Sequence, residues 1–396
     1  MAEAPTIYGD CDPRFARVRE EFARNFAERG DVGAAVSVVL DGMPVVDLWA
    51  GWRDAARTQP WERDTIVPCW SVGKAMSAIA LLRQVDAGLV DLDAPVARYW
   101  PEFGQAGKAR IPVRMLLTHQ SGLPAISEPM EPGIHLTSWE TMVHALEAQA
   151  PWWAPGTKHG YHVNTMGFLV GEVVRRVTGR RIRDVIAEDV AGPLDAEFIV
   201  GTRPEDDART ADWLAYEYQA GEDRNERRPW MAAKPEEESP RDRMRKLTYS
   251  NPGSAPGGVS SRVWRAAEFP STNGHSNARS IARIFGALAR GGTASNGWGV
   301  LDGATVEAAA QTYADGEDEV LGRPTRFGLG FQLTIPGIRP LGPNPGAFGH
   351  YGNGALVGFA DPVAGLAFAF TCNQSGRSWR DPRNIALIDR AYECLG

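Results

Sequence analysis

Segments with strand-like sequence lie at both ends of this chain, and helix-like segments fill its middle. Residues 33–51 hold two apolar, β-branched runs around an Asp-Gly pair, which predicts a β-hairpin. Residues 355–373 predict a second strand pair, which turns at "DPVAG". Between them, residues 138–149 and 165–179 have apolar residues at helical spacing. We therefore predict an α+β fold, in which one antiparallel sheet gathers strands from both ends of the chain.

The length of 396 residues is too great for one small core, so we expect two subdomains. A discontinuous α/β subdomain would comprise residues 1–90 and 262–396, with helices at 13–30, from Ser71 to Gly88, and at 381–395. A helical subdomain would comprise residues 91–261. Within it, residues 203–247 are densely charged, which predicts an exposed excursion or flap.

Composition narrows the functional class. The net charge of −7 and the pI near 5.6 argue against a nucleic-acid partner, which needs a basic surface. No segment reaches about 18 consecutive apolar residues, so no membrane span is predicted. The four cysteines form no CxxC pair, and no metal-binding motif is present. We therefore expect free thiols and neither metal nor organic cofactor. Residues 1–12 are acidic where a signal peptide would be basic, which favours a cytoplasmic protein.

The stretch "VPCWSVGKAMSAIALL" (67–82) places Ser71 and Lys74 one helical turn apart. Lysine is scarce here, because only five of the 42 basic residues are lysines. Lys74 borders a predicted buried stripe made of Ala75, Ala78, Ile79, Leu82 and Val85. Burial and the helix N-terminus both disfavour the ammonium form, so a neutral Lys74 would accept the Ser71 proton. The alternative is that Ser71 caps the helix while Lys74 extends to solvent.

Further motifs occur in a recognisable order: "GLVDLDAPVARYWPEF" (88–103), "IPVRMLLTHQSGLP" (111–124), residues 154–179 with Tyr161, and "FGHYGNGALVGFADP" (348–362). Together with "SVGK" they resemble the serine β-lactamase-like superfamily, most closely the branch of class C β-lactamases and family VIII carboxylesterases. That resemblance implies an antiparallel sheet flanked by helices plus a helical subdomain. It also implies that Ser71 is acylated, that Lys74 accepts its proton, and that Tyr161 shuttles the proton to the leaving group. Tyr161 would act as a phenolate, or as a phenol that shares a proton with Lys74; the alternative is a packed tyrosine.

Two positions depart from the family pattern. Val163 stands where the family's Tyr-x-Asn motif has its asparagine, and Asn164 comes one residue too late. His350-Tyr351-Gly352 replaces the family's Lys-Thr-Gly, so a permanent cation becomes an imidazole that is mostly neutral at pH 7. Both changes weaken recognition of a β-lactam and favour neutral esters.

By the same resemblance, the oxyanion hole uses the backbone N–H groups of Ser71 and Asn353. Gly352 would let its strand pass close to the substrate. His350 would either hydrogen-bond a substrate carbonyl or only fill the space of the lysine. Trp153, with its neighbour Trp152, would wall an acyl pocket or pack in the core.

The predicted function is hydrolysis of small-molecule carboxylic esters through an acyl-enzyme on Ser71. No Gly-x-Ser-x-Gly elbow occurs, so His119 is not expected to form an α/β-hydrolase triad and is predicted to be structural, as is His162. Alternatives are a weak β-lactamase, a D-amino-acid peptidase or amidase, an acyltransferase that uses the same acyl-enzyme, and a non-catalytic sensor. The sequence predicts no oligomeric state.

Overall fold

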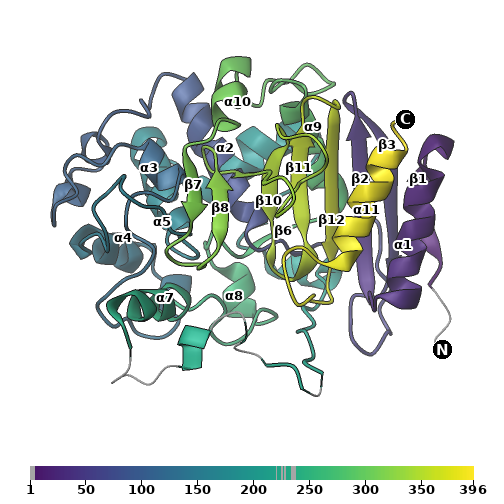
Figure 1. The fold of residues 1–396 in the computed structure, drawn as a ribbon, viewed down its shortest axis with the longest axis horizontal. Helices are drawn as coiled ribbons and strands as arrows, with labels where there is room; N and C mark the ends of the chain where they lie inside the picture. The colour runs from purple at the N-terminus through teal and green to yellow at the C-terminus, as the bar shows by residue number, and fades with distance from the viewer. Residues whose placement is uncertain (1–4, 220, 224–225, 227–228, 233–237) are drawn as a thin grey trace.

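Most strands belong to one large antiparallel sheet, in the order β1-β3-β2-β12-β11-β10-β9-β8-β7 (Figure 1). The computed structural model describes residues 5–219, 221–223, 226, 229–232 and 238–396. The strands of this sheet are β1 (Ile7–Cys11), β2 (Gly33–Leu40), β3 (Met43–Gly51), β7 (Ala314–Glu317), β8 (Pro324–Phe327), β9 (Gln332–Leu333), β10 (Phe348–Tyr351), β11 (Val357–Asp361) and β12 (Leu366–Cys372).

The centre of the sheet joins the two ends of the chain, which confirms the predicted α+β fold. Both predicted hairpins form, as β2–β3 and β11–β12. Asp41 and Gly42 turn the first hairpin with φ of 50° and 80°, the left-handed region that such a turn requires. Strand β2 then pairs with β12 along its whole length. The sequence did not predict β1, whose side chains are mostly exposed at the edge of the sheet.

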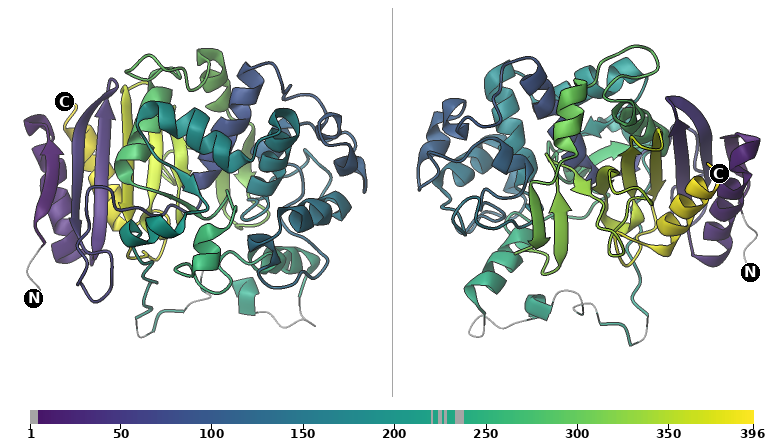
Figure 2. Two further views of the ribbon diagram at one scale, coloured as in Figure 1. Left: turned by 180° about the vertical axis from the view of Figure 1, so that it is seen from behind. Right: turned by 45° about the horizontal axis from the view of Figure 1, so that its top comes forward.

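Helices cover both faces of the sheet (Figures 1 and 2). The predicted terminal helices form as α1 (Ala16–Glu28) and α11 (Pro382–Glu393), which pack against each other on one face. Helix α9 (Ala278–Ala289) covers the other face and contacts β2, β11 and β12. The packing under α9 is close, because a Cβ atom on Gly358 would lie 2.4 Å from Ile281.

Helix α2 (Val72–Asp86) lies inside the molecule, between β10 and helix α5 (Met166–Thr178). The sequence predicted that only one stripe of this helix is buried, but the structure buries every residue from Val72 to Leu82. Val85, near the end of the helix, is only half-buried. Any polar group on the first three turns of α2 is therefore enclosed by protein.

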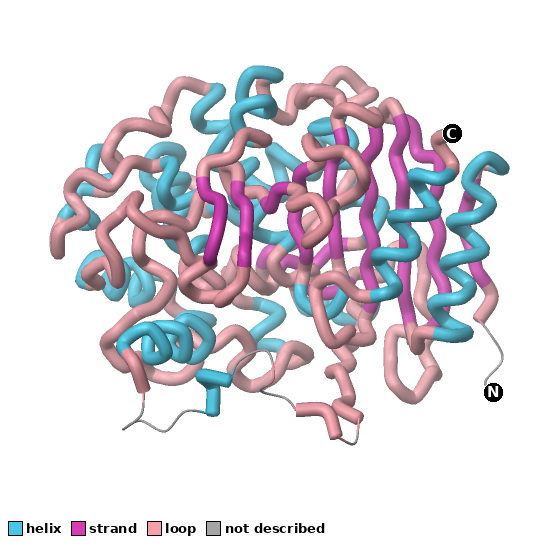
Figure 3. The backbone as a smooth tube through the Cα atoms, viewed as in Figure 1, coloured by secondary structure: helices cyan, strands magenta, loops and turns pink. Residues whose placement is uncertain are grey.

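Helices α3 (Arg114–Leu117), α4 (Trp139–Ala148), α5 and α7 (Pro240–Ser250) gather beyond the β7 end of the sheet, at the left of Figures 1 and 3. Of these, α4 and α5 were predicted. Helices α6 (Ile182–Val185) and α8 (Arg262–Ala266) also come from the middle of the chain. Helix α10 (Gly303–Ala309) follows α9. A small second sheet, β4-β6-β5, is made of β4 (Val67–Pro68), β5 (Ile199–Val200) and β6 (Gly274–Ser276). Strand β5 thus interrupts the predicted helical subdomain, and the subdomain boundaries stay a prediction.

The charged stretch 203–247 is only partly described, since residues 220, 224–225, 227–228 and 233–237 lie outside the described residues. Within the described part, Trp230 and Met244 are buried, so the stretch contributes to the interior as well as to the surface. None of the described helices is long and apolar enough to cross a lipid bilayer.

Candidate active site

Ser71 and Lys74 lie against each other at the start of α2. The Ser71 hydroxyl is 3.2 Å from Lys74 Nζ and makes no capping bond to the helix backbone. Lys74 is completely buried, and its Nζ also donates to the carbonyl oxygen of Ser271 at 3.0 Å. The alternative in which Ser71 caps the helix and Lys74 reaches solvent is therefore wrong.

Two glycines bring the Ser271 carbonyl to Lys74. A Cβ atom on Gly73 would lie 2.2 Å from the carbonyl oxygen of Pro270, and one on Gly167 would lie 2.6 Å from the backbone nitrogen of Ser271. The Ser271 hydroxyl also accepts a hydrogen bond from Gly167 N–H at 2.5 Å. The segment 270–271 can sit between α2 and α5 only because neither helix has a side chain there.

Burial lowers the pKa of Lys74 well below its ordinary value, because the ammonium form loses its hydration. No described carboxylate forms an ion pair with this lysine to offset that cost. The lowered pKa favours the uncharged amine, whose lone pair can accept the Ser71 proton.

Tyr161 lies over the same amine: Lys74 Nζ is 4.8 Å from the centre of its ring. The side chain is 1% exposed, and burial raises the pKa of the phenol well above its ordinary value, although Ser71 acts in the opposite direction. The phenol oxygen itself meets no described group at hydrogen-bond distance and angle. Of the two predicted forms of Tyr161, the structure favours the neutral phenol.

Asp318 holds the backbone of Tyr161 and was not found from the sequence. Both of its carboxylate oxygens accept from Tyr161 N–H at 3.1 Å, and one also accepts from the N–H groups of Val320 and Leu321. Asp318 is fully buried, and burial raises the pKa of its carboxyl group. No motif marks this residue, since its contact with Tyr161 spans 157 positions of sequence.

His350 reaches the same place from β10, with its ring centre 6.0 Å from that of Tyr161. Its Nδ1 is 2.7 Å from the carbonyl oxygen of Tyr351. Because a carbonyl only accepts, the proton is on Nδ1 and Nε2 carries a lone pair. Burial, and secondarily Lys74, lowers the pKa of His350 to about 3, so the ring is neutral. A neutral ring in this tautomer cannot donate from Nε2 to a substrate carbonyl.

The two predicted oxyanion-hole groups lie on segments that meet. A Cβ atom on Gly352 would lie 2.7 Å from the carbonyl oxygen of Cys69, so the end of β10 contacts the segment before Ser71 rather than only the substrate. Trp70, between Cys69 and Ser71, has a left-handed φ of 50°. Among the described residues, no hydrogen bond uses the N–H of Ser71 or of Asn353. Both N–H groups are therefore available to a ligand.

The other predicted substrate-binding residues divide into two groups. Val163 and Trp153 pack in a small apolar cluster around Tyr161. Tyr351 points to the opposite side of the sheet, where its hydroxyl donates to the carbonyl oxygen of Pro340 at 3.0 Å. Asn164 is fully buried and donates to backbone carbonyls, so it does not replace the missing asparagine of the motif.

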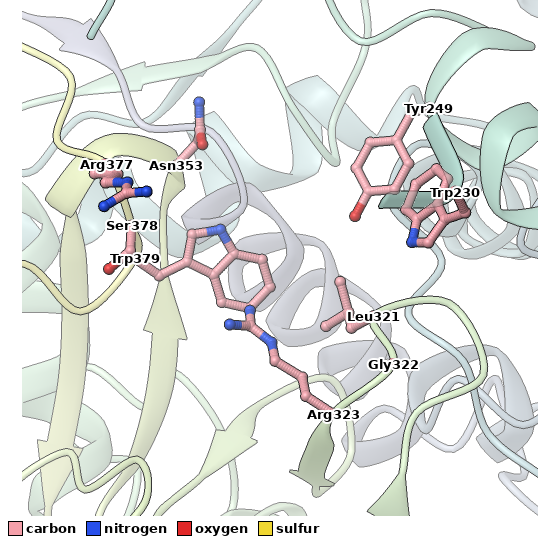
Figure 4. A pocket seen from close by; sticks show the side chains of 9 residues that line it. All are labelled: Trp230, Tyr249, Leu321, Gly322, Arg323, Asn353, Arg377, Ser378 and Trp379. Carbon is pink, nitrogen blue, oxygen red and sulfur yellow. The ribbon is translucent and has the colours of Figure 1, made fainter. Parts of the chain in front are cut away.

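A cavity of about 310 Å³ opens next to Asn353 and Trp379, whose ring contacts Tyr161 (Figure 4). It is lined by Trp230, Tyr249, Leu321, Gly322, Arg323, Asn353, Arg377, Ser378 and Trp379. The Trp379 ring lies 5.5 Å from that of Tyr161, and the Arg323 guanidinium lies 4.7 Å from the Trp379 ring. Apart from Asn353, these residues come from segments outside the motifs, and no sequence pattern marks them.

His119 and His162 hold loops near the site. His119 Nδ1 accepts from His162 N–H, and His162 Nε2 accepts from Leu123 N–H, each at 3.1 Å. These contacts agree with the structural roles predicted for both rings. Among the described residues, no three His, Cys, Asp or Glu side chains are grouped to hold a metal ion.

Comparison with known proteins identifies the family. A family model described as beta-lactamase matches residues 22–393. The esterase/beta-lactamase LipL of Mycobacterium tuberculosis is 35% identical over 380 residues, which cover 93% of this chain and 83% of LipL. A crystal structure of a family VIII carboxylesterase is 36% identical, with a TM-score of 0.88 over 98% of this chain and 100% of that chain. A penicillin-binding protein homologue from Caulobacter crescentus is also 36% identical, with a TM-score of 0.87 over 98% of this chain and 100% of that one.

These matches span nearly the whole chain and agree with the resemblance that its motifs carry. The similarity to solved structures extends over the large sheet and the helices that enclose Ser71, Lys74 and Tyr161. The chain belongs to the β-lactamase family.

Proposed function

We propose that this enzyme is a serine carboxylesterase that cleaves small-molecule esters through an acyl-enzyme on Ser71. The observation that carries the proposal is the pair of Ser71 and a fully buried Lys74, 3.2 Å apart, in which burial lowers the pKa of the amine. A hydroxyl beside such an amine can lose its proton to the amine as it attacks a carbonyl.

The first half of the reaction acylates the enzyme. Ser71 Oγ attacks the ester carbonyl carbon while its proton moves to Lys74. The N–H groups of Ser71 and Asn353 stabilise the oxyanion that forms. The C–O bond to the alcohol then breaks, Tyr161 protonates the leaving oxygen, and Lys74 returns its extra proton to Tyr161.

The second half frees the enzyme. Water attacks the acyl carbonyl carbon and releases the carboxylic acid, while Ser71 Oγ regains a proton. The pocket beside Asn353 would hold one of the two substituents of the ester, and its size of about 310 Å³ fits a small group.

Two features support an ester rather than a β-lactam as the main substrate. His350 is neutral and provides no cation to bind a carboxylate, and Val163 provides no amide group. The names of the similar proteins agree, since one is an esterase/beta-lactamase and another a family VIII carboxylesterase.

Hydrolysis of β-lactams is a second candidate, because the name of LipL includes both activities. The same acyl-enzyme would form, but without a fixed positive charge for the lactam carboxylate we place this activity well below ester hydrolysis. Transfer of the acyl group to an alcohol is a further outcome of the same intermediate. The expected cytoplasmic location belongs to this proposal and rests on the four free cysteines.

The test is intact-mass detection of the acyl-enzyme across a panel of short-chain esters and one chromogenic cephalosporin. We expect Ser71 to gain the mass of the acyl group from the esters, and the Ser71→Ala variant to gain nothing. A cephalosporin that is turned over faster than every ester would overturn the assignment, and so would ester hydrolysis by Ser71→Ala at the wild-type rate.

A further inference from the structure

Near Lys74, the Tyr161 hydroxyl and His350 Nε2 are buried and make no hydrogen bond with any described residue. Each side chain is 1% exposed, and the two rings face each other at 6.0 Å with an angle of 33° between their planes. Lys74 lies close to both, over the Tyr161 ring and near enough to influence His350 electrostatically. Unpaired polar atoms are costly in protein interiors, so these two point to a ligand between them.

The chemistry of the two atoms is complementary. The phenol oxygen both donates and accepts, whereas His350 Nε2 only accepts, because Nδ1 carries the ring proton and donates it to the Tyr351 carbonyl at 2.7 Å. A group that binds to His350 here must therefore have an O–H or N–H to donate. An ester carbonyl and a carboxylate have none.

We propose that His350 Nε2 accepts a hydrogen bond from the water molecule that hydrolyses the acyl-enzyme. The proposal rests on the esterase function above and assigns His350 to its second half. One O–H of the water would donate to Tyr161 Oη, the other to His350 Nε2, and a lone pair of the water oxygen would then face the acyl carbonyl carbon.

The proton transfers balance. As the water oxygen bonds to the acyl carbon, its first proton moves to Tyr161 Oη and the phenol proton moves to Lys74 Nζ. When the bond between the acyl carbon and Ser71 Oγ breaks, Lys74 returns that proton to Ser71. The second water proton stays on the carboxylic acid, so His350 orients the water without taking a proton.

This arrangement favours water over an alcohol as the attacking group. Water has two O–H groups and can satisfy Tyr161 and His350 at once. An alcohol has only one O–H group, which must donate to Tyr161. Its carbon atom would then lie against the lone pair of His350 Nε2, which would stay without a hydrogen bond. His350 is therefore the residue that makes hydrolysis prevail over acyl transfer.

The experiment measures how the acyl-enzyme divides between water and methanol in wild type, His350→Leu and His350→Gln. Leucine removes the acceptor, whereas the glutamine side chain can place its amide oxygen near the position of Nε2. With one activated ester, the burst of released alcohol gives the acylation step, the steady state gives deacylation, and the acid-to-methyl-ester ratio gives the partition.

For His350→Leu we expect a full burst, a deacylation rate that falls about tenfold, and a ratio of acid to methyl ester that falls about fivefold or more. His350→Gln should return that ratio to within about threefold of wild type. The control is Ser37→Ala, which removes another buried polar atom that has no described partner. Ser37 is in register with His350 across the sheet but lies three strands away from it. It should leave the ratio unchanged.

An unchanged ratio in a His350→Leu enzyme that still gives a burst would overturn the proposal, because it would mean that water needs no acceptor at this position. A ratio that falls equally in His350→Gln would overturn it as well. Neither result would touch the esterase function, which instead fails if wild type forms no acyl-enzyme with any ester.

Discussion

Two lysines among the described residues, Lys74 and Lys108, are fully buried. The hydrogen-bond partners of each amine indicate whether its role is structural or chemical. Lys108 donates to the carbonyl oxygens of Glu147 and Gln149 at 2.8 and 2.6 Å, and burial lowers its pKa to about 8. Lys74 meets one carbonyl and one hydroxyl. Burial alone therefore does not mark a lysine as catalytic. Lys74 differs from Lys108 because it lies beside a hydroxyl group that can lose a proton.

The opposite pKa shifts of Lys74 and Tyr161 predict the pH dependence of ester hydrolysis. Lys74 must be neutral to accept a proton, so kcat/KM should fall as the pH drops through its lowered pKa. Tyr161 must keep its proton to protonate the leaving group. Because the pKa of its phenol is raised, kcat/KM should fall only at strongly alkaline pH. Between these limits kcat/KM should be flat. His350 and His162, with pKa values of about 3, contribute nothing to the profile near neutral pH.

The measurement is kcat/KM from about pH 5 to about pH 10 at constant ionic strength, with an ester whose alcohol does not titrate in that range. A profile that rises through a group with the ordinary pKa of lysine would contradict the neutral amine at position 74.

The variants Lys74→Ala and Tyr161→Phe test the same pair directly. Each should lower kcat/KM by about two or more orders of magnitude while the fold persists, since each removes a proton carrier. Circular dichroism and thermal unfolding check the fold. Near-normal turnover in either variant would remove that residue from the mechanism.

At the scale of elements, the site depends on the segment 270–271 between α2 and α5. It connects Lys74 of one helix to Gly167 of the other through the carbonyl and hydroxyl groups of Ser271. Each helix has a glycine at the point of contact, Gly73 in α2 and Gly167 in α5. Each glycine is the second residue of its helix, and a side chain at either position would collide with segment 270–271.

The change Gly73→Ala tests this packing. Alanine in place of glycine stabilises a helix interior by about 1 kcal/mol, and the gain at Gly73 should be smaller because it lies in the first turn of α2. Here the added methyl group would lie 2.2 Å from the Pro270 carbonyl oxygen, so we expect a net destabilisation of about 1–3 kcal/mol. Because Ser271 would move away from Lys74, kcat should also fall by about 100-fold.

Urea unfolding and steady-state kinetics give the two quantities. Gly299→Ala is the control, since its Cβ atom would meet nothing within 4 Å, and it should change neither quantity. A Gly73→Ala enzyme that is more stable than wild type and fully active would refute the packing argument.

The sequence predicted elements whose signals are local: both hairpins, helix α2, the terminal helices, and the residues of the motifs. It did not predict Ser271 or Asp318, because these reach Lys74 and Tyr161 across 197 and 157 positions of chain. The tautomer of His350 and the orientation of Tyr351 depend on backbone contacts of β10, which the motif letters do not contain. Single charged or aromatic residues such as Arg323 and Trp379 have no pattern that marks them.

At the scale of the whole molecule, the two ends of the chain are joined by a buried ion pair as well as by the sheet. Arg383, in the first turn of α11, donates to Asp31 at 2.6 Å and to Asp381 at 2.8 Å. Asp31 directly precedes the β2 region, and both members of the Asp31–Arg383 pair are almost completely buried. The C-terminal helix therefore fixes the N-terminal half of the sheet.

The variant Arg383→Met leaves the Asp31 carboxylate buried without its partner. We expect a loss of about 3–5 kcal/mol in the free energy of unfolding, measured with urea. The double variant Asp31→Asn/Arg383→Met removes the unpaired charge and should regain part of the loss. If the single and double variants are equally unstable, the ion pair is not the cause.

Strand β2 pairs with β12, so Ala34 meets Cys372 across 338 positions of chain. During translation, the edge of β2 that β12 covers stays open until the ribosome has made the whole intervening segment. A chain that terminates before β12 would therefore be an inactive fragment with an exposed strand edge, a natural target for chaperones and proteases.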